Sequence, residues 1–189
     1  LVAAFADGTT ATLPVENALA INEFLADPTT GDGGVDANGD GSIDSDDDFV
    51  EILNISAAPV DISGYELDDE ANGGGEPYVF PQGTVLDAGQ AAVIFRGGTP
   101  TGIPGFSDTG LPSLNNGGDD IILRDDQGND LQSLTYPVAG AIPEQDGIST
   151  ARNINGVGGF ALQSNFGSMT AASPGLNNDD GGALPVELG

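Results

Sequence analysis

Six aspartates crowd the thirteen residues DANGDGSIDSDDD (36–48), and this stretch contains no Lys or Arg. Side-chain oxygens recur there at nearly alternate positions, and Gly41 stands where the chain must turn sharply. This is the spacing D-x-[DN]-x-[DN]-G of calcium loops, which surround the ion with oxygen ligands. The seventh position supplies a backbone carbonyl in such loops. The sequence therefore predicts a Ca²⁺ site formed by Asp36, Asn38, Asp40, Ser42, Asp44 and Asp47.

The loop differs from an EF-hand at its twelfth position, where Asp47 replaces the usual Glu. In this it resembles the loop of dockerin modules, but a dockerin has two such loops and flanking helices. Here one copy lies between the strand-like segments INEFLA (21–26) and FVEILNI (49–55). We therefore interpret it as an insertion between two strands, which calcium would order by offsetting the repulsion among its carboxylates.

Further carboxylates lie close to the predicted site. The sequence does not decide whether they complete the shell of the first ion, bind a second ion or face solvent; they are Asp27, Asp32, Asp46, Asp48 and Glu51. The alternative for the whole stretch is a solvated acidic loop without metal.

The charge balance excludes several classes of protein. Thirty acidic residues face three arginines (Arg96, Arg124 and Arg152), so the formal net charge is -27. Such a polyanion repels nucleic acid and anionic membrane surfaces. No apolar run approaches the ~18 residues of a membrane span, so we expect no membrane insertion. The chain has no Cys, and a bound metal is a common substitute for disulfides in extracellular domains.

The residue types also limit catalysis. Without His or Cys, neither a Ser-His-Asp triad nor a Cys-His pair can form. The segment SDTG (107–110) resembles an aspartic-protease motif, but no second copy exists, and we interpret it as a loop turn. Carboxylates at 68–70 and 119–120 are adjacent along the chain, so they point apart and suit a second calcium site or a solvated surface better than glycoside hydrolysis. We predict that the chain is not an enzyme.

Short β-branched or aromatic runs, separated by Gly, Pro, Asn and Asp, predict an all-β sandwich. No segment keeps a helical period over three turns. We expect a hairpin at 124–132 and core positions for Tyr65, Tyr78, Phe80 and Tyr136. The predicted strands are 18–26, 49–55, 60–67, 78–81, 91–95, 120–125, 130–137 and 147–153.

The order of these segments resembles the lamin-tail domain, an immunoglobulin-like β-sandwich found in nuclear lamins and in secreted bacterial proteins. The resemblance covers 18–178 and lies in INEFLADP (21–28), DFVEILNISAAPVDISGYELDD (48–69), YVFPQGTVLDAGQAAVIF (78–95), LNNGGDDIILRDDQGNDLQSLTY (114–136) and SPGLNN (173–178). It implies an immunoglobulin-like β-sandwich with a long calcium-binding loop after the first core strand, as in bacterial members. It implies no single activity, because the domain accompanies nucleases and adhesins as an accessory part.

Two segments lie outside this resemblance. Residues 1–17 form an N-terminal extension with strand propensity, which we interpret as a donor or edge strand. Residues 179–189 form a C-terminal tail in which ALPVELG (183–189) resembles the junction before a removed sorting domain. An isolated strand cannot satisfy its own backbone groups, so the extension should pair with a sheet edge of its own subunit or of a neighbour.

Two functions of different class are compatible with these features. The first is a secreted, calcium-stabilised structural module that self-assembles, as an extracellular filament subunit by strand addition or as part of a cell-surface layer. Its partners would be copies of itself, in a homo-oligomer or homopolymer. The alternative is a calcium-dependent adhesion or polysaccharide-binding accessory module with a glycan or matrix ligand. Both place the protein outside the cell or on its surface.

Overall fold

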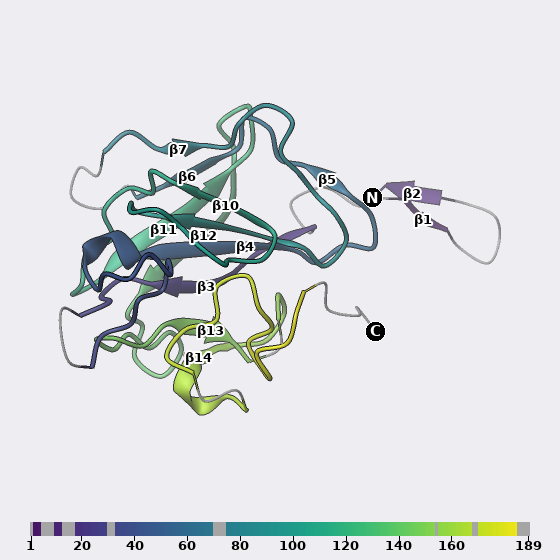
Figure 1. Ribbon diagram of the computed structural model, residues 1–189. Coiled ribbons are helices and arrows are strands. Elements are labelled where there is room, and N and C mark those ends of the chain that lie inside the picture. The colour runs from purple at the N-terminus through teal and green to yellow at the C-terminus, as the bar shows by residue number, and fades with distance from the viewer. Residues whose placement is uncertain are drawn as a thin grey trace.

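The computed structural model describes residues 2–4, 10–12, 18–29, 33–69, 75–153, 155–167 and 170–184. Two main sheets face each other, which confirms the predicted all-β sandwich (Figure 1). The six-stranded sheet has the order β10 (Phe106–Thr109), β9 (Ala91–Phe95), β4 (Phe49–Asn54), β3 (Leu19–Leu25), β13 (Thr150–Arg152), β14 (Phe160–Leu162). The four-stranded sheet has the order β12 (Asp130–Tyr136), β11 (Asp119–Arg124), β6 (Glu66–Asp68), β7 (Tyr78–Val79).

Smaller elements complete the described chain. Two short antiparallel pairs stand apart from the main sheets, β1 (Val2–Ala4) with β2 (Thr10–Thr12) and β5 (Val60–Asp61) with β8 (Val85–Leu86). Two single-turn 3₁₀ helices are η2 (Ser45–Asp47) and η3 (Gln163–Asn165). Within the described ranges, no helix is both long and apolar enough to cross a membrane.

The main core fills the space between the two sheets. Alternate residues of each strand point inward, and Tyr65, Tyr78, Phe80 and Tyr136 all belong to this core, as predicted. Phe24 of β3 lies near its centre, with its ring centroid 4.7 Å from that of Tyr136. Because the two rings come from opposite sheets, this contact couples the layers directly.

A second, smaller core covers the outer face of the six-stranded sheet. Leu25, Phe49, Val93 and Phe95 form a cluster separate from the first core, together with Ala37 of the acidic stretch. The partly buried residues that pack against this cluster are Val35, Ile103 and Ala172. The central strands β3, β4 and β9 are therefore buried along their whole length. Since Ala37 lies in the acidic stretch, the insertion is a cover for the sheet and not a free appendage.

Two local predictions were wrong. The segment 60–67, expected as one strand, divides into β5 and β6, because Gly64 adopts a φ of +76° that turns the chain between them. The SDTG segment, expected as a loop turn, lies mostly in β10, which pairs in parallel with β9. Its Asp108 accepts a hydrogen bond of 2.7 Å from the Tyr78 hydroxyl, a contact between distant segments that local sequence does not reveal.

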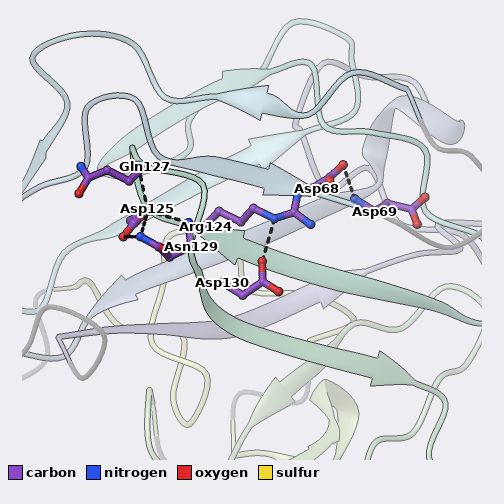
Figure 2. A network of polar contacts seen from close by, with 7 residues as sticks. All are labelled: Asp68, Asp69, Arg124, Asp125, Gln127, Asn129 and Asp130. Atoms are coloured by element: carbon purple, nitrogen blue, oxygen red, sulfur yellow. Dashed lines mark hydrogen bonds and ion pairs between the residues drawn. The ribbon is translucent and has the colours of Figure 1, made fainter.

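The predicted hairpin at 124–132 is confirmed, with β11 and β12 paired antiparallel. Figure 2 shows Arg124 extended between carboxylates of the neighbouring strands β6 and β12. Its Nε donates a hydrogen bond of 2.8 Å to Asp130 Oδ1, and its Nη1 contacts Asp68. One of the three cations therefore stabilises the four-stranded sheet.

The inter-sheet contact of Phe24 provides a test of this core. We expect Phe24→Ala to lower the free energy of unfolding by about 3–5 kcal/mol, because the substitution leaves a cavity between the sheets. The exposed Val157, with 66% of its surface accessible, is the control, and Val157→Ala should change stability by less than about 0.5 kcal/mol. Equal effects of the two substitutions in urea denaturation would contradict this packing.

Candidate metal centre

The predicted calcium loop lies between β3 and β4 at one end of the sandwich, and its last turn is the helix η2 (Figure 1). All six predicted ligands are within the described residues. Asp47 and Asn38 are buried, with 0% and 1% of their surface accessible, whereas Asp40, Ser42 and Asp44 are exposed and Asp36 is intermediate. The site thus has a buried inner side and an open outer side.

Four of the predicted ligands each accept a hydrogen bond from a backbone N–H two to five residues further along the chain. The pairs are Gly41 N to Asp36 Oδ2 (3.0 Å), Asp40 N to Asn38 Oδ1 (2.9 Å), Ser42 N to Asp40 Oδ1 (2.9 Å) and Asp46 N to Asp44 Oδ1 (2.9 Å). These bonds wind the loop tightly around its own side chains. In each of the three carboxylates, those of Asp36, Asp40 and Asp44, one oxygen accepts this hydrogen bond from the loop backbone.

Asp47 closes the loop across its two halves. Its Oδ1 accepts from Asn38 N and its Oδ2 from Asp44 N, each over 3.0 Å. The bond from Asp44 N belongs to a capping box at the start of η2, in which the Asp44 side chain also accepts a backbone bond. The position at which this loop departs from the EF-hand pattern is therefore its best-anchored residue.

One oxygen of the loop has no partner. Asp36 Oδ1 is buried and accepts no hydrogen bond from the residues that the structure describes. A buried carboxylate oxygen without a donor is costly, and a cation is one means of satisfying it. Asp36 holds the first ligand position of the motif, so this atom fits the predicted calcium shell.

The segment 97–110, which runs from the end of β9 into β10, contacts the acidic loop through its first residues. Thr101 N donates to Asn38 O over 2.8 Å, and Thr99 N lies 3.3 Å from Asp40 Oδ2. The approach depends on glycine, because a Cβ on Gly39 would stand 2.4 Å from Thr101 O. The first residues of this segment therefore lie against Asn38 and Asp40, two of the predicted ligands.

The carboxylates respond to these surroundings in opposite ways. Hydrogen bonds from the Ser42 and Thr99 backbone hold the pKa of Asp40 below its ordinary value. Burial raises the pKa of Asp47, although three backbone N–H groups partly offset the effect. Burial also raises the pKa of Asp48 to about 8, and its ion pair with Arg96, at 3.8 Å, is too long to prevent this.

Within the described ranges, no group of three or more Asp, Glu, His or Cys side chains already converges as a bound metal requires. The four carboxylates of the predicted set, those of Asp36, Asp40, Asp44 and Asp47, therefore do not converge on one point in this structure. All donors are hard oxygens, which suit Ca²⁺ better than softer metals. The arrangement can hold a cation and offers no nucleophile.

Comparison with protein families agrees with the order of strands. The family model of the Lamin Tail Domain matches residues 13–137, more than half of the chain. The chain belongs to the lamin tail domain family. Comparison with curated proteins yields no match. The lamin tail domain is a structural, immunoglobulin-like domain family and not an enzyme family.

A buried glutamate pair of this lamin tail domain was missed at the level of sequence. A β-bulge at Asn22 places Glu23 of β3 directly opposite Glu51 of β4, and both side chains are 0% exposed. Burial raises the pKa of both carboxyls, and the charge of Glu23 adds to the effect on Glu51. Polar residues inside two strongly apolar strands were the available signal.

The pair anchors a segment that lies beyond the family match. Glu23 accepts from Ser173 N (2.8 Å) and Ser173 Oγ (2.7 Å), and Glu51 accepts from Gly175 N (2.7 Å). The SPGLNN segment (173–178) therefore binds the outer face of the six-stranded sheet through carboxylates. Because neither carboxyl is exposed, we assign the pair a structural role.

The pair generates a pH prediction. In the folded state the pKa of Glu51 lies above its ordinary value of 4.5, so protonated Glu51 stabilises the fold. This contribution to the free energy of unfolding is fully present below pH 4.5 and is lost as the pH rises through the folded-state pKa. The free energy of unfolding should therefore fall between about pH 5 and 8, by at most ~1.4 kcal/mol per pH unit for each proton.

Glu51→Gln removes this titration, so its stability curve should fall less steeply than that of the wild type in chemical denaturation. All samples should contain EDTA, which keeps metal binding out of the comparison. The exposed Glu76→Gln is the matched control and should retain the wild-type slope. Parallel curves for Glu51→Gln and the wild type would show that Glu51 does not take up a proton on folding.

Proposed function

We propose that this lamin tail domain is a secreted, calcium-stabilised structural module that assembles with copies of itself and has no catalytic activity. The observation that carries the calcium part is the hydrogen-bonded loop at 36–47, in which Asp36 Oδ1 is buried without a partner among the described residues. The family supports the structural part, because lamin tail domains are structural modules.

The ion would be held by Asp36, Asn38, Asp40, Asp44 and Asp47 and by the Ser42 carbonyl. Calcium supplies positive charge to a stretch that has none of its own. The loop residues contribute the rest: Asp47 ties the two halves together, and Ala37 covers Phe49 and Phe95. Metal binding would therefore stabilise the second core as well as the loop.

The open outer side of the loop and the short Asp47 favour a weak site. Calcium affinities of extracellular modules lie in the range of about 10⁻⁴–10⁻³ M. A site of that strength fills where calcium is abundant, which supports an extracellular or cell-surface location.

The N-terminal strands support self-assembly. Residues 2–4 and 10–12 pair only with each other among the described strands, as a hairpin drawn beyond the sandwich and opposite to the acidic loop (Figure 1). An isolated two-stranded hairpin is marginally stable in water. Addition to a sheet edge of a neighbouring copy would stabilise it, and β12 is the longest edge strand, with seven residues. The rest of the predicted extension, residues 1, 5–9 and 13–17, lies outside the described residues.

Calcium removal tests the metal part of the proposal. At a hundredfold excess over Kd, an ion that binds only the folded state stabilises it by ~2.7 kcal/mol. For a chain of this size we expect the melting temperature to rise by about 5–10 °C between EDTA and saturating calcium.

Asp36→Asn should lose most of this increment, because it removes the charge of the unsatisfied ligand. Asp87→Asn, which changes an exposed carboxylate outside the loop, should keep it. Identical melting curves of the metal-free wild type with and without calcium would refute the site.

The assembly part has its own test. We expect the full chain with calcium to form polymers visible by electron microscopy and light scattering, and deletion of residues 1–12 to abolish them. Ala11→Pro, which removes a backbone N–H from β2, should also prevent polymerisation, whereas Ala11→Ser, which keeps the N–H, should not.

Filaments formed by the deletion variant would show that the hairpin is not the donor. A full chain that stays monomeric with calcium, over the whole accessible range of protein concentration, would reject self-assembly.

A further inference from the structure

A separate acidic cavity lies beside η2, which contributes Ser45 to its lining. Its volume is about 270 Å³. It is lined by residues from three connections between strands: Asp27, Pro28, Thr29, Ser45, Asp48, Asn116 and Asp146. None of these belongs to the predicted calcium set of the loop.

Two buried oxygens of this cavity have no hydrogen-bond partner among the residues that the structure describes. They are Asp48 Oδ1 and Thr29 Oγ1. The Asp48 side chain is 3% exposed, and its other oxygen lies 3.8 Å from Arg96 Nη1, beyond hydrogen-bonding distance. Buried oxygens without donors occur where a ligand supplies what the protein does not.

The backbone around the cavity holds its lining in place. Gly147 N donates to Asp27 O over 2.7 Å, which brings the loop of Asp146 against the end of β3. Thr29 N donates to Asp27 Oδ1 over 3.0 Å, and Thr29 has a φ of +54°, the only positive value for a non-glycine residue in the described ranges. A β-branched residue in this conformation is strained, and here the strain coincides with the unpartnered hydroxyl.

Acidic groups outnumber basic ones around the cavity. Three carboxylates, those of Asp27, Asp48 and Asp146, face one guanidinium, that of Arg96. Asp146 is exposed and Asp27 is partly exposed, so both side chains can rotate toward Asp48 without disturbing the core. Among the described residues, these three carboxylates do not form a converged group in this structure.

We propose that this cavity is a second Ca²⁺ site, with Asp48, Asp27 and Asp146 as charged ligands and Thr29, Ser45 and Asn116 as neutral oxygen donors. The donor set contains only oxygen, which excludes a preference for zinc or copper. The donors come from three connections between strands and define no rigid octahedron, so Ca²⁺, with its flexible shell of 6–8 oxygens, fits better than Mg²⁺.

This site would have a role that the loop site lacks. It joins the end of β3, η2 and the loop before β11 to Asp146, which lies beyond the family match at 13–137. A cation there would bind the C-terminal part of the chain to the lamin tail domain from the end of the sandwich. The glutamate pair already binds that part from the outer face.

The test is the number of calcium ions bound by the full chain. It can be measured by equilibrium dialysis with ⁴⁵Ca in 0.15 M KCl and 1 mM MgCl₂, which suppress diffuse binding to a polyanion. We expect two ions for the wild type and one for the double variant Asp27→Asn and Asp146→Asn. Both changes are isosteric, and the amide oxygen introduced at position 27 can still accept from Thr29 N.

The reciprocal variant separates the two sites. Asp36→Asn should also bind one ion, and adding it to the double variant should remove both. Asp87→Asn, the matched control, should bind two. With a single substitution in the cavity, Asp146→Asn, we expect the affinity for the second ion to fall at least tenfold.

Each other outcome has a definite meaning. A wild-type stoichiometry of zero, or an undiminished stoichiometry in the double variant, would overturn the second site. Loss of an ion in the double variant but not in Asp36→Asn would support the cavity and contradict the loop site of the proposed function. Circular dichroism and gel filtration of each variant exclude unfolding as the cause of lost binding.

Discussion

The chain has thirty acidic residues and only three arginines, and this shortage of positive charge constrains how it folds. Each arginine is already engaged: Arg124 bridges two strands, Arg96 approaches Asp48, and Arg152 donates to the carbonyls of Ile21 and Gly158. Buried carboxylates must therefore be held by backbone N–H groups and hydroxyls. Glu23, Glu51 and Asp47 all accept from backbone N–H groups. Glu23 and Glu51 tie the SPGLNN segment to the six-stranded sheet, and Asp47 ties the two halves of the acidic loop together.

The same shortage explains why loops cover the outer face of that sheet. In a simple two-layer sandwich, that face would be open to solvent and polar at alternate positions. Here the acidic insertion, the start of the 97–110 loop and the SPGLNN segment supply N–H donors and apolar cover together. The central strands become buried on both faces, and two carboxylates are enclosed in the process. The covering loops are thus part of the folding unit, although the last of them lies beyond the family match.

The proposed calcium sites contain buried side-chain oxygens that accept no hydrogen bond from the described residues. Asp36 Oδ1 and Asp48 Oδ1 are buried at the same end of the sandwich and lack donors among the described residues. Asp36 stands at the start of the acidic loop, and Asp48 follows directly after η2. Cations at these positions would supply charge where the chain has least of its own, and would leave the opposite end, with the N-terminal hairpin, free for contacts between copies.

Local sequence determined a large part of this protein. Strand positions such as Phe49–Asn54 and Ala91–Phe95, the hairpin after Arg124 and the tightly wound loop at 36–47 follow from side-chain pattern and turn chemistry, which act over a few residues. Only the tertiary structure determined which distant segments of the chain are in contact. Pairing of Glu23 with Glu51 depends on a bulge at Asn22, the parallel strand β10 depends on β9, and the cavity beside Asp48 joins residues as distant as Asp27 and Asp146. Such contacts are set by the packing of segments far apart in the chain, and no local pattern records the distance between them.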